Sequence, residues 1–169
     1  MAITKIQSES LNLADTYAFT GTVTGAGGVN TPYFAAYEGA QTITSGTPTK
    51  LTMTSFIDSG NNYDDTNYRF TVPAGQGGKY WFSLHGQPFQ ANSSTNGGAL
   101  VFYKNGSTLG NQYQGSLYQI STFRNHYITT NGIITLAAGD YVEGYGYATY
   151  SSGSGGVAYV KMFGYKLIE

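Results

Sequence analysis

Hydrophobic and polar residues alternate with a period of two in segment after segment of this chain, and nowhere is the 3.6-residue period of a helix sustained. The alternation is clearest in KLTMTSFI, NYRFTV and KYWFSLHG, at 50–57, 67–72 and 79–86. The residues expected on the core-facing sides of these segments are Leu51, Met53 and Ile57; Tyr68, Phe70 and Val72; and Tyr80, Phe82 and Leu84. The pattern predicts an all-β chain.

Turn-forming residues separate the predicted strands. Asn105 and Gly106 suit a tight type I′ hairpin turn, and Asp140, which follows Gly139, is expected to accept hydrogen bonds from turn amides. Further strands are expected at 33–37, 99–104, 116–130, 132–136, 140–149 and 156–168. Many short strands divided by Gly- and Asn-rich turns are typical of a β-sandwich or jelly roll.

The first part of the chain has a different pattern. It contains only brief apolar patches and ends in a Gly-rich run before Pro32. This break predicts an arm at 1–31 and one domain at 32–169. The residues through which the arm is expected to attach are Leu11, Leu13, Tyr17, Phe19 and Val23. The alternative is a terminal segment without a role.

Charge and composition narrow the classes of partner. A net charge of −1 leaves no basic excess to neutralise phosphates, so neither nucleic acid nor an anionic membrane surface is an expected partner. The first ten residues carry no apolar run, and no stretch of about 18 apolar residues occurs, so we expect a protein made in the cytosol. The absence of cysteine excludes disulfides, thiolate metal sites and a cysteine nucleophile.

Candidate chemistry is sparse. Asp58, Asp64 and Asp65 offer oxygen ligands for calcium, but they lack the regular spacing of an EF-hand loop. A hydrolytic triad could be drawn from Ser83, His126 and an aspartate, yet no Gly-x-Ser-x-Gly motif supports it. We therefore expect no catalytic residue and no cofactor, with calcium binding at the three aspartates as the alternative.

Tyrosine is unusually frequent, with 16 residues. Part of this excess suits the core, and part suits subunit contacts or ligand recognition, because a tyrosine tolerates a surface that is apolar at one end and wet at the other. The tyrosines outside an obvious core alternation are Tyr113, Tyr118, Tyr127, Tyr141, Tyr145, Tyr147, Tyr150, Tyr159 and Tyr165.

A series of motifs covers the predicted domain. They are FAAY at 34–37, NYD at 62–64, FTVPAGQGGKYWF at 70–82, KNG at 104–106, LAAGDYV at 136–142 and FGYKL at 163–167. In this order they resemble the globular head of complement component 1q and the wider complement 1q/tumour necrosis factor family. The PAGQGGKY segment is longer than is usual there, and no collagen-like stalk precedes the domain.

The resemblance implies a ten-stranded jelly-roll sandwich that forms a homotrimer around a three-fold axis lined with aromatic residues. Under this implication, the candidate interface residues are Tyr159, Tyr165, Tyr145 and Tyr147. Some members of the family bind calcium, which keeps the three aspartates as candidates.

The predicted arm has a resemblance of its own. ITKIQSESLNLADTYAFTGTVTGAGG looks like N-terminal stretches of tail-fibre-like and other virion proteins of bacteriophages, especially marine ones. This implies a non-enzymatic virion protein, made in the host cytoplasm, whose trimeric knob is attached to the particle as a capsid decoration or head fibre. Its partners would be other virion proteins and a host-surface glycan or protein.

Three alternatives to the capsid-bound knob stay open at the level of sequence. The first is a tail-appendage receptor-binding protein, and the second is a soluble module that recognises carbohydrate or protein. The third is an enzyme, for which no site supports an activity.

Overall fold

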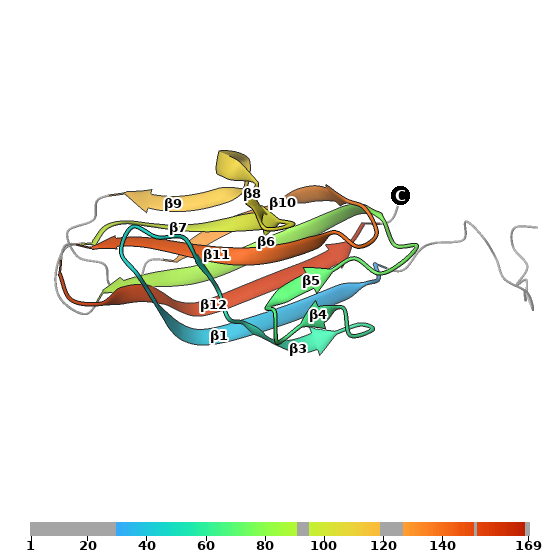
Figure 1. Cartoon of the computed structure of the whole chain (residues 1–169), viewed down its shortest axis with the longest axis horizontal. Helices are drawn as coiled ribbons and strands as arrows, with labels where there is room; N and C mark the ends of the chain where they lie inside the picture. The colour runs from blue at the N-terminus through green and yellow to red at the C-terminus, as the bar shows by residue number, and fades with distance from the viewer. Residues whose placement is uncertain (1–29, 91–94, 119–126, 151, 168–169) are drawn as a thin grey trace, which may run out of the picture.

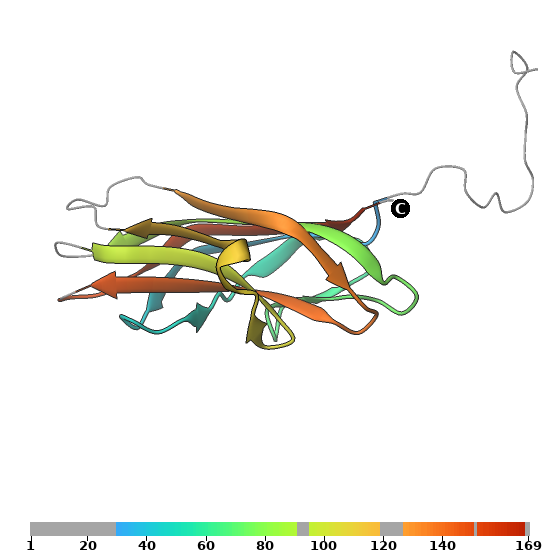
Figure 2. The ribbon, with the colours of Figure 1, turned by 90° about the horizontal axis from the view of Figure 1, so that it is seen from above.

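The computed structural model describes residues 30–90, 95–118, 127–150 and 152–167. Within them the chain forms two antiparallel β-sheets whose long strands run side by side along the longest axis of the molecule (Figures 1 and 2). The two-sheet, antiparallel architecture confirms the predicted jelly-roll class. The described residues form twelve strands rather than the expected ten, and three of the twelve are only two residues long.

The first sheet has five strands in the order β10-β6-β12-β1-β3. Their bounds are Ile128–Leu136 for β10, Gly78–Gln90 for β6, Gly155–Lys166 for β12, Tyr33–Ile43 for β1 and Thr54–Asp58 for β3. β12, the last strand in sequence, therefore lies between β1 and β6, which makes the two ends of the domain neighbours. The backbone N–H of Lys166 donates to the carbonyl of Pro32 at 3.0 Å, so both ends of the described domain lie together.

The second sheet has seven strands, with β4-β5-β11-β7-β8 in order, β2 paired to β11 and β9 paired to β7. A short 3₁₀ helix, η2, precedes β9. The bounds are Tyr63–Asp64 for β4, Arg69–Thr71 for β5, Tyr141–Tyr150 for β11, Thr95–Lys104 for β7, Ser107–Thr108 for β8, Thr49–Lys50 for β2, Gly110–Tyr113 for η2 and Gln114–Tyr118 for β9. No helix in the described residues is long and apolar enough to cross a membrane.

The core lies between the sheets and is rich in aromatic rings. Phe34 stacks on Phe70 with ring centroids 4.9 Å apart, and Phe82 packs against Phe70 at 5.9 Å. Tyr80, Phe82 and Leu84 of β6 are fully buried, as the alternation predicts. Burial of large rings and branched side chains is the main stabilising contribution to such a sandwich.

The predictions for Ile57 and Tyr68 were wrong. Ile57 is 48% exposed, because a β-bulge between Ala35 and Ala36 pairs Ile57 with Ala35 and turns it to the outer face. Tyr68 has a φ of 51° and lies in the turn before β5, so it does not continue the alternation of Phe70. In both cases a local backbone feature interrupts the period of two.

The predicted turn chemistry is confirmed at the β7–β8 hairpin. Asn105 and Gly106 have φ values of 51° and 77°, the two positive values that a type I′ turn requires. The attachment residues predicted for the arm, Leu11, Leu13, Tyr17, Phe19 and Val23, lie outside the described residues, as does His126.

Candidate functional site

The outer face of the five-stranded sheet, which we call the aromatic face, points away from the core and is unusually apolar. Within the described residues, every exposed large hydrophobic side chain comes from this sheet or from the residue before β10. They are Tyr33, Tyr37, Phe56, Ile57, Tyr127, Ile133 and Tyr159. Single exposed apolar residues are normal on a protein surface, whereas a contiguous group of them marks an interaction site.

The strand register arranges the aromatic face in rows that run across the sheet. At the end nearest the start of β1, Ile133, Trp81, Tyr165 and Tyr33 follow one another on β10, β6, β12 and β1. The Trp81 and Tyr165 rings pack with centroids 5.3 Å apart. Three residues of this row, Trp81, Tyr165 and Tyr33, line an apolar hollow of about 500 Å³ together with Ile57 of β3.

A second row crosses the middle of the same face and is polar. Thr129, His85, Lys161 and Tyr37 follow one another on β10, β6, β12 and β1. Around them lies a second hollow, of about 650 Å³, which we call the Lys161 hollow. Its lining residues are Tyr37, His85, Tyr127, Tyr159, Lys161 and Phe163. A volume of this size is within the range of small-ligand sites.

His85 is held firmly in the polar row. Its Nε2 lies 2.8 Å from the hydroxyl of Ser83 and its Nδ1 lies 3.2 Å from the hydroxyl of Thr129, while its ring packs edge-on against Phe163. Desolvation, with the charge of Lys161 adding to it, lowers the pKa of His85. Both ring nitrogens thus bond neutral hydroxyls, an arrangement that orients the ring but lacks the carboxylate of a hydrolytic triad.

Tyr159 has an uncommon backbone conformation at the edge of the Lys161 hollow. Its φ is 52°, a left-handed value that is an outlier for a bulky side chain. The strand pairing of β12 with β6 shifts between Ala158 and Lys161, so a bulge leaves Tyr159 and Val160 without register partners on β6. The bulge directs the Tyr159 ring to the surface, where 53% of it is exposed.

The four tyrosines predicted at a subunit interface lie on two different sheets. Tyr159 and Tyr165 lie on β12, on the aromatic face. Tyr145 and Tyr147 lie on β11 of the seven-stranded sheet instead, so they cannot share one surface with the first pair. The alternation along a strand reveals its faces but not the sheet to which the strand belongs.

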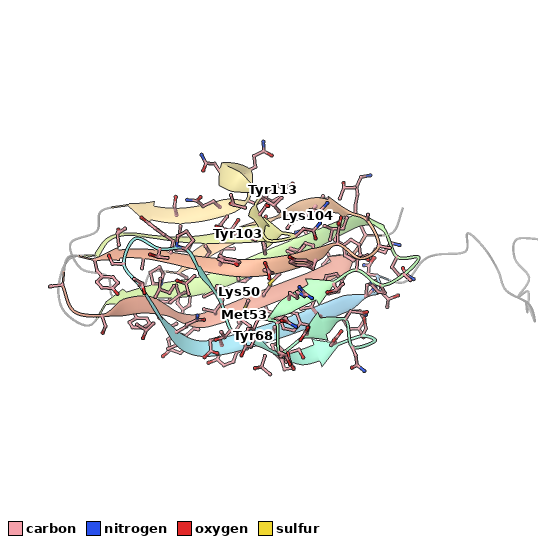
Figure 3. The ribbon with its side chains drawn as sticks, in the orientation of Figure 1. Lys50, Met53, Tyr68, Tyr103, Lys104 and Tyr113 are labelled. Carbon is pink, nitrogen blue, oxygen red and sulfur yellow. The ribbon has the colours of Figure 1, made fainter. Side chains whose placement is uncertain are left out.

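On the outer side of the seven-stranded sheet, aromatic and charged side chains contact one another. Tyr103, labelled in Figure 3, stacks on Tyr145 with ring centroids 3.8 Å apart. Beside them, Lys50 forms an ion pair with the buried carboxylate of Glu143. Burial raises the pKa of Tyr145, and the charge of Glu143 adds to this effect. These groups satisfy one another within the sheet.

The three aspartates proposed for calcium each hold a part of the loop around β4. Asp58 accepts from the backbone N–H of Tyr63 at 2.9 Å, and Asp65 accepts from that of Ser55 at 2.7 Å. Asp64 accepts from the side chain of Asn67 at 2.6 Å and from two backbone N–H groups of its own turn. In the described part of the chain, no group of three or more acidic or histidine side chains is arranged to hold a metal ion.

Comparison with known proteins identifies the fold from structure alone. No protein-family model and no curated protein matches the sequence. The globular domain of zebrafish complement 1qA is similar in structure, with a TM-score of 0.57 and 15% identity over 82% of this chain and 98% of that one. Eiger, a tumour necrosis factor of S. frugiperda, is similar with a TM-score of 0.56 and 14% identity over 82% of this chain and 94% of that one.

Murine APRIL at pH 8.0 gives a TM-score of 0.58 with 12% identity over 80% of this chain and 98% of that one. In all three cases nearly the whole of the known domain is matched, by about four-fifths of this chain. At such low identity the likeness concerns the fold alone. The chain therefore has the jelly-roll fold shared by complement 1q and tumour necrosis factor-like domains.

Proposed function

We propose that this protein is a non-enzymatic homotrimeric recognition module whose subunits associate through the aromatic face. The observation that carries the proposal is the concentration of exposed large apolar side chains on one sheet. On the opposite outer face Tyr103 stacks on Tyr145 and Lys50 pairs with Glu143, and none of the described side chains there is an exposed large hydrophobic. The fold shared with complement 1q and tumour necrosis factor-like domains supports the same conclusion.

The aromatic face has the chemistry of an interface between copies of the chain. Its apolar row brings Trp81 and Tyr165 beside a hollow, and aromatic anchors near such hollows dominate the binding energy of protein interfaces. Ser83 lies under the face with 2% exposure, and its hydroxyl already forms a hydrogen bond with His85. Covering the face would therefore not leave this hydroxyl without a hydrogen-bond partner. A second copy could therefore bury this surface without leaving Ser83 unsatisfied.

The finer proposal is that the trimer is a knob attached to a bacteriophage particle by residues 1–31, as a capsid decoration or head fibre. Its support is the resemblance of the arm to virion proteins, together with the position of the domain ends. Because Pro32 and Lys166 are hydrogen-bonded neighbours, the arm joins the knob beside the end of its last strand. In this proposal the opposite end of the knob contacts a host-surface glycan or protein.

The association face is tested with two matched variants. Tyr37→Glu introduces a charge on the aromatic face, where Tyr37 is 40% exposed, and Tyr147→Glu introduces the same charge on β11 of the other sheet. We expect Tyr37→Glu to give monomers in light scattering while Tyr147→Glu remains trimeric. Far-UV circular dichroism checks that both variants fold. If Tyr147→Glu alone dissociates the trimer, the interface lies on the seven-stranded sheet and the proposal fails.

The virion proposal has a separate test. Deleting residues 1–29 leaves β1 and the described domain intact, so the truncated protein should fold and associate as the full chain does. Incorporation into phage particles assembled with the truncated protein should be lost. Incorporation at the full-length level would contradict the attachment role of the arm, and binding of the knob to a glycan in the absence of any particle would favour a free recognition module.

A further inference from the structure

Lys161 is the one cation among the residues that line the Lys161 hollow. It is exposed on β12, beside His85 on β6 and Tyr37 on β1. No carboxylate of the described residues lies within ion-pair distance of its ammonium group. The described acidic residues are bonded elsewhere, namely Glu38, Asp58, Asp64, Asp65, Asp140 and Glu143.

Apart from His85, whose ring nitrogens already bond Ser83 and Thr129, the other polar groups that line the hollow are phenols. Tyr37, Tyr127 and Tyr159 line the hollow, and their hydroxyls make no hydrogen bond to another described residue. A phenol can donate a hydrogen bond to an anion, and an ammonium group attracts one. The hollow thus combines one positive charge with several available donors, and it contains no carboxylate that would repel an anion.

We propose that the Lys161 hollow binds an oxyanion, of the sulfate, phosphate or carboxylate class, and that this anion stabilises subunit association. The inference rests on the proposed function, because it is association through the aromatic face that would remove Lys161 from water. A buried charge without a partner is costly, and an anion bound beside Lys161 compensates it. The strained backbone of Tyr159 fits this role, since it directs a hydroxyl-bearing ring to the rim of the hollow.

Lys161→Met is the variant that separates charge from packing, because methionine keeps an unbranched apolar side chain without the ammonium group. Lys166→Met is the matched control on the same strand, since Lys166 bonds Gln76 and does not line the hollow. The association constant is measured by analytical ultracentrifugation in sodium sulfate, sodium phosphate and sodium chloride at equal ionic strength.

For the wild-type protein we expect sulfate and phosphate to strengthen association relative to chloride. Each bound anion should shift the equilibrium by about 100-fold when its concentration is about 100 times its Kd. Lys166→Met should respond as the wild type does, while Lys161→Met should associate equally well in all three salts. A wild-type trimer that is indifferent to the anion, or a Lys161→Met trimer that still responds to it, would overturn the inference.

Direct binding separates failure of this inference from failure of the proposed function. Isothermal titration of sulfate into the wild type and into Lys161→Met reports on the hollow whatever the oligomeric state. A monomer that binds sulfate only when Lys161 is present contradicts the trimer and supports an oxyanion site. A trimer without Lys161-dependent binding supports the proposed function and overturns the site.

The same titration distinguishes an inorganic oxyanion from the acidic group of a sugar. Glucuronic acid carries a carboxylate on a ring that could pack on the aromatic side chains of the hollow. A lower Kd for glucuronic acid than for sulfate identifies an acidic glycan as the ligand class, and a lower Kd for sulfate identifies the free ion. Either result supports the oxyanion site, whereas binding of neutral glucose with the same affinity would contradict it.

Discussion

At the scale of single residues, one aspartate shows how the turn residues stabilise this fold. Asp140 accepts from the backbone N–H of Ala137 at 2.8 Å and from the side chain of Asn105 at 2.7 Å, and it pairs with Lys104 at 2.8 Å. These contacts lower the pKa of Asp140 to about 2, with the hydrogen bond from Lys104 contributing most and that from Asn105 next. The expectation that Asp140 accepts from a turn amide is confirmed by the Ala137 bond.

The charge of Asp140 therefore stabilises the folded state fully at pH values above the ordinary aspartate pKa of 3.8. This contribution is lost as the pH falls towards about 2. We expect Asp140→Asn to lower the free energy of unfolding at pH 7 by about 1–3 kcal/mol, because a charged hydrogen-bond acceptor is removed. Urea unfolding over a pH series checks the sign. If the difference in the free energy of unfolding between wild type and variant stays constant from pH 7 to pH 2, the ionised carboxylate is not the cause of the wild type's greater stability.

At the scale of secondary-structure elements, the sequence predicts strand faces well where the pairing is regular. The alternation of Tyr80, Phe82 and Leu84 is recovered in β6 because both neighbouring strands continue on either side of it. Ile57 was misplaced because its face depends on a bulge in the pairing of β3 with β1, and a bulge is a property of two strands that neither sequence segment specifies alone.

The pairing of β1 with β12 supplies a prediction at this scale. A β-carbon at Gly156 would collide with the backbone carbonyl oxygen of Gln41 and would lie 3.0 Å from the ring of Phe89. Backbone cannot give way as a flexible side chain can, so Gly156→Ala should lower the free energy of unfolding by about 1–3 kcal/mol or more. Gly39→Ala on β1 is the control, since its β-carbon would meet only the Tyr37 hydroxyl, at 3.7 Å. Equal melting temperatures for the two variants would show that β1 and β12 are not this closely paired.

At the scale of the whole molecule, the sequence indicates the candidate site only in part. The excess of tyrosine points to a contact surface, but Tyr145 and Tyr147 lie on the opposite sheet from Tyr159 and Tyr165. Which strands share a sheet is determined by long-range pairing, and the composition of one strand does not encode it. For the same reason the row of His85, Lys161 and Tyr37 cannot be predicted from the sequence, because these residues are far apart along the chain.

The central claim is that three copies of the chain cover the aromatic face, and the mass of the full-length protein in solution tests it most directly. Light scattering at low micromolar concentration should give about 54 kDa, three times the chain mass of 18.1 kDa. The measurement is best made in phosphate buffer, where any oxyanion requirement is met. A mass of 18.1 kDa at these concentrations would contradict the claim, because the exposed rings of Tyr33, Tyr37 and Tyr159 would then remain in water.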